Sequence, residues 1–305
     1  MAPSTSSPAS PVTQRCVRTA TLDVALDELN PGGARTALLL HGWPDAPLTW
    51  HPVGRNLAAA GWRVLMPALR GVGETRFVRA DTPRSGQLAA LGRDLLDLLD
   101  ALALPAPPLL VGHDWGARAV ANACGLRPGV ASHLVMVSVG YGTNLPGQDL
   151  SLSQARNYWY HWYMATARGE RAVRDQRRDF ARMMWDTWAP TGWYTEDDFL
   201  SAAAAWDHPD WADIVLHSYR HRWGHAPGFE VHAADEAALS PPPRLAVPTL
   251  VIHGEVDGAN HPSTSAGKEG FFSGRYERIV LPGVGHFPQR EATPAVAEAI
   301  LRFVG

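Results

Sequence analysis

Asp114 lies in a short glycine motif between an apolar run and a helix signal. The motif is Gly112-His113-Asp114-Trp115-Gly116, and it follows the apolar residues 109–111. The serine version of this motif, G-x-S-x-G, is a strained turn that lifts a nucleophile out at the end of its strand. A carboxylate there changes the chemistry, because aspartate attacks an sp³ carbon that bears a leaving group and becomes the acyl half of a covalent ester. The motif therefore predicts a nucleophilic aspartate, although aspartate is also a favoured helix cap.

Two later residues complete a catalytic order. Asp257 follows the apolar run 249–253, and His286 follows the run 277–281. The chain order Asp, Asp, His mirrors the order nucleophile, acid, base of serine hydrolases with the same elbow. Sites in open α/β sheets form beyond the carboxyl ends of strands, where all three residues would lie. Glu255 competes with Asp257, but Asp257 is better placed in the turn before Gly258, and His286 has the plain alternative of a turn residue.

A second motif offers backbone donors. In His41-Gly42-Trp43-Pro44 the glycine lets the backbone approach a neighbouring segment closely, and the proline restricts the chain direction. One interpretation is that the bond before Pro44 is cis. The Trp43 amide and the Trp115 amide at the elbow would then point into one pocket as an oxyanion hole. An ordinary strand-to-helix turn is the alternative for this motif.

The elements around these motifs alternate between strand and helix patterns. Apolar or alternating runs predict strands, and Leu recurring at intervals of three and four predicts an amphipathic helix. The predicted strands are 22–29, 36–40, 63–68, 109–112, 133–139, 249–253 and 277–281, and the predicted helices are 50–60, 87–104, 115–126 and 293–303. This order predicts an α/β fold with a mostly parallel sheet and helices on both faces.

The alternation stops between residues 144 and 245. Helical patterns dominate there, at 153–166, 170–188, 195–206 and 210–223. A gap this long is not expected to be loop, so we predict a helical cap at 144–245 inserted into a core of 16–143 and 246–305. Residues 1–15, rich in Ser, Pro and Thr, predict a disordered tail and no signal peptide.

Eight of the 12 tryptophans fall in the predicted cap, since only Trp43, Trp50, Trp62 and Trp115 lie outside it. Such aromatics could line a dry cavity over a reactive centre. For any single tryptophan, packing between cap helices is the simpler interpretation.

Composition excludes several classes of protein. A net charge of -3 and a pI near 6.5 give no reason to expect nucleic acid or an anionic membrane as partner. No apolar run is long enough to span a bilayer. Two cysteines, Cys16 and Cys124, make neither a disulfide framework nor a zinc site, which favours a cytoplasmic protein. The oligomeric state stays open, with a homodimer as one option.

With these residues in place, the chain resembles the α/β-hydrolase-fold epoxide hydrolases, which are related to haloalkane and haloacetate dehalogenases. The resemblance covers nearly everything after residue 20 and lies in His41-Gly42-Trp43-Pro44, His113-Asp114-Trp115-Gly116, Asp257 and Gly285-His286. Ala68 departs from it, because the family often has an acidic residue there. The resemblance implies hydrolysis of a small hydrophobic epoxide by water, with no cofactor and no metal.

The resemblance also implies two cap tyrosines that hold and protonate the epoxide oxygen. The family pattern at the cap start matches Tyr160-His161-Trp162-Tyr163, and the Tyr-Arg pair near the cap end matches Tyr219-Arg220. We assign Tyr160 and Tyr219, with Tyr158 and Tyr163 as rivals for the first. Trp43, Trp115, Trp162 and Tyr163 are the predicted substrate-binding residues.

Two other functions remain as alternatives. In a dehalogenase the same Asp114 would displace a halide held by Trp115 and a cap tryptophan such as Trp162, but the arginine that haloacetate dehalogenases carry directly after the nucleophile is Trp115 here. His161-Trp162 resembles the His-Trp pair of haloacetate dehalogenases, and Arg118 lies where they have one carboxylate-binding arginine. Arg118 could therefore bind a substrate carboxylate, although we expect a surface or salt-bridged residue. A non-catalytic ligand-binding protein of this fold would have no need of Asp257 or His286.

Overall fold

The computed structural model describes residues 11–145 and 148–305. Within this part of the chain, nine strands form one sheet in the order β1-β2-β4-β3-β6-β7-β8-β9, with β5 paired to β2. The strands are β1 (Thr13–Arg18), β2 (Leu22–Leu29), β3 (Arg35–Leu40), β4 (Trp62–Pro67), β5 (Arg76–Phe77), β6 (Leu109–His113), β7 (His133–Val137), β8 (Thr249–Gly254) and β9 (Tyr276–Leu281). From β4 to β9 along this order every pairing is parallel, which confirms the predicted sheet.

The central strands are apolar because helices cover both of their faces. All five residues of β6 are buried between β3 and β7. Successive side chains of a strand point to opposite faces. Leu38, Leu40 and Leu110 accordingly join one apolar cluster, and Leu39 and Val111 join the other. A continuous apolar run is what a parallel strand buried on both sides requires.

Each face of the sheet has its own helices. Residues of α2 (Leu88–Leu102) and α3 (Trp115–Leu126) belong to the first cluster, which continues into the helices between β7 and β8. Residues of α1 (His51–Ala59) and α12 (Thr293–Val304) belong to the second cluster. The short helix α11 (Pro288–Glu291) precedes α12. The predicted core helices are thus present within a few residues of their predicted ends.

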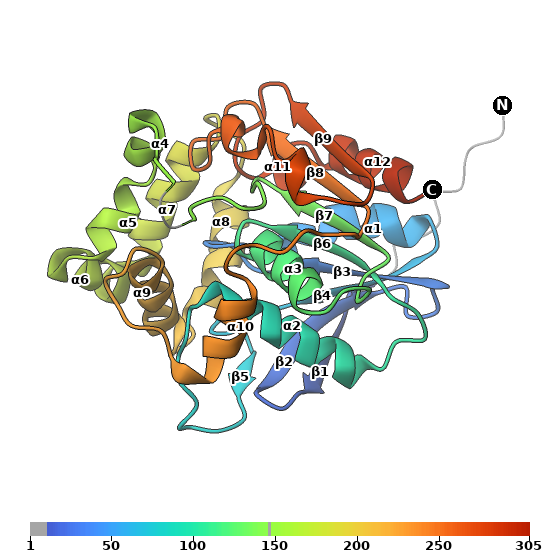
Figure 1. Cartoon of the computed structure of the whole chain (residues 1–305), viewed down its shortest axis with the longest axis horizontal. Helices are drawn as coiled ribbons and strands as arrows, with labels where there is room; N and C mark the ends of the chain where they lie inside the picture. The colour runs from blue at the N-terminus through green and yellow to red at the C-terminus, as the bar shows by residue number, and fades with distance from the viewer. Residues whose placement is uncertain (1–10, 146–147) are drawn as a thin grey trace.

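The segment between β7 and β8 is helical, and these helices gather on one side of the sheet, at the left of Figure 1. They are α4 (Leu152–Asn157), α5 (Trp159–Met164), α6 (Ala167–Asp175), α7 (Arg177–Trp188), α8 (Glu196–Ala203) and α9 (Trp211–Arg222). The short α10 (Ala233–Ala238) lies apart from them, against α2 and α3. We propose residues 144–245 as a cap inserted into the core on this basis.

Several predicted details need correction. The predicted helix 153–166 is two helices that meet at Tyr158, and 170–188 is two helices that meet at Gln176. The short α10 was not foreseen. Residues 1–10 of the predicted tail lie outside the described residues, and β1 already begins at Thr13, so the prediction of a tail to residue 15 was too long. Among the described helices, none is long and apolar enough to cross a membrane.

Candidate active site

Asp114 occupies a strained turn between β6 and α3. Its backbone has φ 49° and ψ −111°, a conformation that L-residues rarely adopt and that costs about 1–3 kcal/mol. A Cβ on Gly112 would lie 2.2 Å from the Gly116 carbonyl oxygen, and a Cβ on Gly116 would lie 2.2 Å from that of Leu40, so both positions need glycine. The Asp114 side chain makes no capping hydrogen bond to α3. The turn therefore presents a carboxylate that the helix does not use.

The two carboxylate oxygens of Asp114 have different neighbours. The Trp43 backbone N–H donates to Oδ1 at 3.0 Å, and Oδ2 lies 3.9 Å from Nε2 of His286. Close approach of this loop depends on Gly42, where a Cβ would meet Cβ of Asp114 at 2.5 Å. The Trp43-Pro44 bond is cis, as one interpretation of the motif predicted. Trp115 begins α3, and first-turn amides of a helix have no intrahelical acceptor.

His286 is held by a buried carboxylate. Its Nδ1 lies 2.8 Å and 3.0 Å from the two carboxylate oxygens of Asp257. The backbone amides of Ala259 and Asn260 also donate to Oδ1 of Asp257, each at 2.8 Å, so this buried carboxylate has several hydrogen-bond donors. The proton therefore sits on Nδ1, and Nε2 carries the lone pair. Within the described residues Nε2 has no hydrogen-bond partner, although it is buried. The rival Glu255 is exposed and accepts a hydrogen bond from the Gly283 amide.

Charge outweighs burial at this pair. Burial alone would raise the pKa of Asp257, but His286 and the neighbouring His253 hold that pKa well below its usual range. Burial alone would lower the pKa of His286, but the Asp257 carboxylate raises the pKa above the ordinary 6.5. The arrangement stabilises an imidazolium while it keeps a basic nitrogen close to Asp114.

Two of the candidate tyrosines pack against Trp43, and one of them also packs against Trp115; these two tryptophans lie beside Asp114. The Tyr219 hydroxyl accepts a hydrogen bond from the Trp115 indole N–H at 3.2 Å, so its own proton is left to donate. The Tyr160 ring lies 5.4 Å from the Tyr219 ring, and both rings contact Trp43, at 5.7 Å and 5.1 Å between centroids. Burial, together with the neighbouring Asp114 charge, raises the pKa of both phenols. Both are therefore protonated donors at neutral pH.

The rival tyrosines lie elsewhere. The Tyr158 hydroxyl donates to Oδ1 of Asn260 at 2.6 Å and accepts from Asn144 at 3.1 Å, so its hydrogen bonds are taken. Tyr163 is half-buried and packs against Trp159 and Phe180. The geometry favours Tyr160 as the first cap tyrosine.

Two predicted substrate-binding residues, Trp162 and the Tyr163 described above, are not among the rings around Asp114. Trp162 is 37% exposed, and its indole N–H donates to the Ala155 carbonyl at 3.1 Å. Its side chain contacts Trp223 and His161 rather than the rings around Asp114. Trp162 faces outward because α5 is a single short helix, on which its neighbours Tyr160 and His161 take the buried positions. The assignments of Trp162 and Tyr163 to substrate binding are therefore not supported.

His161 is a buried polar residue that sequence reasoning did not select. Its Nδ1 accepts a hydrogen bond from the Trp223 indole N–H at 2.9 Å, so the ring proton sits on Nε2. That N–H is buried and has no acceptor among the described residues, and the ring lies 4.6 Å from Tyr219. Burial and the nearby arginines Arg222 and Arg118 hold the pKa of His161 well below its ordinary value. Its one sequence signal was the resemblance of His161-Trp162 to the His-Trp pair of haloacetate dehalogenases, which did not lead us to select it.

The cap holds the loops that carry the site. The indole N–H groups of Trp185 and Trp206 donate to the carbonyls of Pro44 and Asp45, at 2.8 Å and 3.2 Å. The Trp188 carbonyl accepts from the amides of Gly258 and His286, at 3.1 Å and 3.0 Å. These tryptophans do more than pack cap helices. They tie residues 41–46, which carry the Trp43 amide and are called the oxyanion loop after its predicted role, to the loops that carry Asp257 and His286.

The described part of the chain contains no group of three or more His, Cys, Asp or Glu side chains that could hold a metal ion. The constellation consists of the Asp114 carboxylate, His286 paired with a second carboxylate, backbone donors and two phenols. Such a set can open an electrophilic carbon centre by covalent catalysis and resolve the ester with water.

Comparison with known proteins assigns the class. Residues 37–293 match the family defined by the alpha/beta hydrolase fold. The crystal structure of a Klebsiella pneumoniae protein, provisionally assigned as an epoxide hydrolase, superposes with a TM-score of 0.88 at 34% identity, over 95% of this chain and 97% of that chain. The chain belongs to the α/β-hydrolase-fold epoxide hydrolases, as the resemblance implied.

Two curated relatives, both named epoxide hydrolase, match this chain over nearly their whole length. An epoxide hydrolase from Caballeronia sordidicola is 29% identical over 307 residues, which cover 93% of this chain and 92% of the relative. Epoxide hydrolase A from Mycobacterium tuberculosis (strain ATCC 25618 / H37Rv) is 27% identical over 324 residues, covering 96% of this chain and 97% of the relative.

Proposed function

We propose that this protein hydrolyses an epoxide to a vicinal diol through a covalent ester on Asp114. The observation that carries the proposal is the placement of two protonated phenols, Tyr160 and Tyr219, against the rings beside the nucleophile. An epoxide opens to an alkoxide, which is a poor leaving group without a proton donor. The family membership and the names of the relatives support the same reaction.

In the first step Oδ2 of Asp114 attacks an epoxide carbon and the carbon–oxygen bond breaks. Oδ2 is the nucleophile because Oδ1 is already bound by the Trp43 amide. The released oxygen takes a proton from Tyr160 or Tyr219, which leaves a hydroxyalkyl ester on Asp114. General acid catalysis of this kind is typically worth ~10² to 10⁴ in rate.

In the second step Nε2 of His286 removes a proton from water, and the hydroxide attacks the carboxyl carbon of Asp114. Negative charge then builds on Oδ1, where the Trp43 amide already donates and where the Trp115 amide can join it. Collapse of the tetrahedral intermediate releases the diol. The proton on His286 and the second proton of the water, which stays on the new Asp114 carboxyl group, pass to the departing alkoxide and to the tyrosinate, so that Asp114, His286 and the tyrosine regain their starting states. Asp257 stabilises the imidazolium during this step.

A dehalogenase would use the same aspartate, but neither of the two halide donors predicted from the sequence is free at the site. The Trp115 indole N–H is bound to Tyr219, and Trp162 lies at the surface. A protein that binds its ligand without turnover would gain nothing from the His286–Asp257 pair. Both alternatives are outcomes of the following test.

The test measures diol from styrene oxide and halide from 1-bromobutane and fluoroacetate, with wild type, Asp114→Asn and Tyr219→Phe. We expect diol from the wild type, no diol from Asp114→Asn, and a rate lower by ~10² or more in Tyr219→Phe. Tyr194→Phe is the matched control, because that phenol is bound to Asp186 at 2.5 Å in the outer part of the cap. Halide release that survives Tyr219→Phe, without diol from the epoxide, would identify a dehalogenase.

The covalent step has its own readout. His286→Gln removes the base but not the nucleophile, so we expect the ester to accumulate, with a protein mass increase equal to the mass of the epoxide. A ligand-binding protein would show no such adduct.

A further inference from the structure

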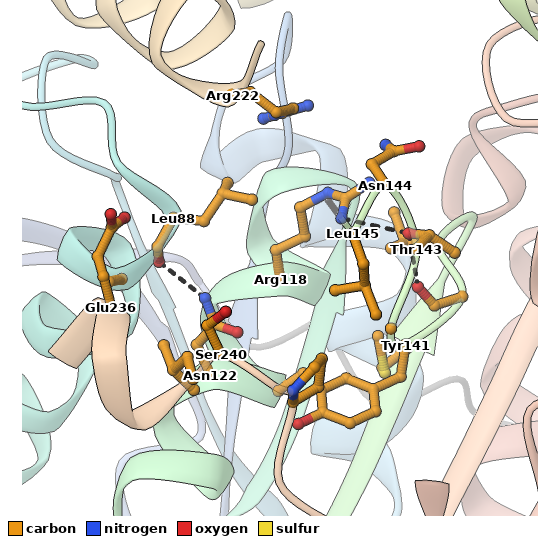
Figure 2. Close-up of a pocket in the computed structure, with 18 of the residues that line it drawn as sticks. Leu88, Arg118, Asn122, Tyr141, Thr143, Asn144, Leu145, Arg222, Glu236 and Ser240 are labelled. Carbon is orange, nitrogen blue, oxygen red and sulfur yellow. Dashed lines mark hydrogen bonds between the residues drawn. The ribbon is translucent and has the colours of Figure 1, made fainter. Parts of the chain in front are cut away.

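A cavity of about 280 Å³ lies between α3, α9 and the segment after β7. Arg118 of α3 and Arg222 at the end of α9 line it, with Thr143 and Asn144 beside them (Figure 2). Its remaining lining is largely apolar and includes Leu88, Met136, Val139 and Tyr141. The cavity therefore combines an apolar wall with two guanidinium groups.

Arg118 is buried without a carboxylate, contrary to the expectation of a surface or salt-bridged residue. It is 9% exposed, and within residues 11–145 and 148–305 it forms no salt bridge and its Nε has no partner. Its one hydrogen bond, from Nη1 to the Thr143 hydroxyl, is long at 3.4 Å. A buried charge that lacks a partner is costly, so this guanidinium is expected to have a ligand.

Other buried arginines of the same chain show the contrast. Arg70 donates to both oxygens of Asp94, each at 2.6 Å, and Arg290 donates to both oxygens of Asp45, at 2.9 Å and 2.6 Å. Such paired geometry is how a buried guanidinium is normally satisfied. Arg118 has the burial of these residues but not their carboxylate.

Arg222 repeats the pattern on the facing helix. It is half-buried, its buried Nε has no partner among the described residues, and its bond to the Ser218 hydroxyl is 3.5 Å long. The two guanidinium groups are close enough that Arg222, after burial, is the main cause that lowers the pKa of Arg118. An anion between them would offset both the burial and the mutual repulsion.

The cavity adjoins the catalytic residues. Arg118 lies four residues after Asp114 on α3, about 6 Å along the helix axis. The Arg222 guanidinium lies 4.9 Å from the ring centre of Tyr219, the phenol assigned to the epoxide oxygen. A group held by the two arginines would thus belong to the molecule whose epoxide faces Asp114.

The charges of the cavity favour a monoanion. Two arginines stand against one carboxylate, Glu236, which lies 3.4 Å from His221 on the far side of the cavity in Figure 2. One positive charge is left uncompensated. The planar fork of a guanidinium matches a carboxylate.

We propose that Arg118 and Arg222 bind a carboxylate of the substrate, so that this enzyme acts on epoxides that carry a carboxylate group. The inference rests on the proposed epoxide hydrolysis and adds the class of substrate to it.

The experiment compares 5,6-epoxyhexanoate with its neutral analogue 5,6-epoxyhexanamide in chloride-free buffer. We expect kcat/KM of the wild type to be at least ~10-fold higher for the acid, since hydrogen bonds to charged groups have this weight. Arg118→Met and Arg222→Met should each lower kcat/KM for the acid by ~10- to 100-fold and lower it much less for the amide. Arg171→Met removes an exposed arginine of α6 and should keep the wild-type preference.

A second measurement does not depend on turnover. Calorimetric titration should show that the wild type binds hexanoate more tightly than hexanamide, and that Arg118→Met and Arg222→Met lose this preference. Diol formed equally from acid and amide would overturn the carboxylate site while the epoxide hydrolase stands. No diol from either compound would contradict the proposed function, and the hexanoate titration would then decide the carboxylate site alone.

Discussion

At the scale of single residues, the site depends on how the Asp257 charge changes His286. Burial would lower the pKa of His286, and Asp257 raises it above 6.5. A raised pKa means that the base is protonated, and therefore inactive, over a wider range on the acid side. We expect ester hydrolysis to decline as the pH falls through this raised pKa.

Asp257→Asn tests that dependence. Without the carboxylate, burial dominates, so the pKa of His286 falls and the acid limb of kcat moves to lower pH. The plateau should drop by ~10³ to 10⁴, because the imidazolium and the productive tautomer lose their partner. The measurement is kcat against pH for wild type and variant, with the exposed Glu255→Gln as control. An acid limb that stays in place would contradict the role given to Asp257.

The sequence predicted some site residues and not others, for physical reasons. Asp114, Asp257 and His286 each follow an apolar run, so the geometry of a parallel sheet brings them to one edge. No such rule selects among cap tyrosines, because which face of a short helix is buried depends on its neighbours. Arg118 was misjudged because its spacing on α3 does not reveal that its surroundings lack a carboxylate.

At the scale of elements, strands and core helices were predictable from the spacing of their apolar residues. Side chains return to the same face every two residues in a strand and every 3.6 residues in a helix, so burial of one face against the sheet leaves that spacing in the sequence. The cap was predictable only as helical. Its helices divide at Tyr158 and Gln176, where neither glycine nor proline marks a break, so contacts between helices decide the boundaries. The most consequential element is α7, whose last residues hydrogen-bond to three loops of the candidate site, at Pro44, Gly258 and His286.

Trp185→Phe tests the link from α7 to the oxyanion loop. The variant removes the N–H that donates to the buried Pro44 carbonyl at 2.8 Å. An unsatisfied buried acceptor costs about 1–3 kcal/mol, so urea unfolding should show a loss of this size. Because Trp43 directly precedes Pro44 in this loop, ester hydrolysis should slow more than ester formation, which rapid quench and intact-protein mass would show. Trp162→Phe is the matched exposed control, and equal effects of both variants would contradict this link.

At the scale of the whole molecule, a buried ion pair joins segments 245 residues apart. Arg290 of α11 donates to both oxygens of Asp45, in the loop that follows β3. The pair brings the oxyanion loop and the end of the chain that follows His286 to a common anchor. Burial would raise the pKa of Asp45, but Arg290 holds it below the ordinary 3.8. Because the folded pKa is the lower one, this stabilisation is present at neutral pH and is lost as the pH falls through the folded value.

Asp45→Asn leaves Arg290 buried without its charge partner and should lower the free energy of unfolding by about 3–5 kcal/mol at pH 7. Urea unfolding from pH 7 to pH 3 measures the difference, which should shrink toward acid because only the wild type loses the pair there. Asp81→Asn, in the exposed pair with Arg79, should leave the unfolding curve unchanged. A difference that stays constant with pH would show that Asp45 acts through packing and not through its charge. The same variant should also slow hydrolysis, since the loop that it loosens carries the Trp43 amide.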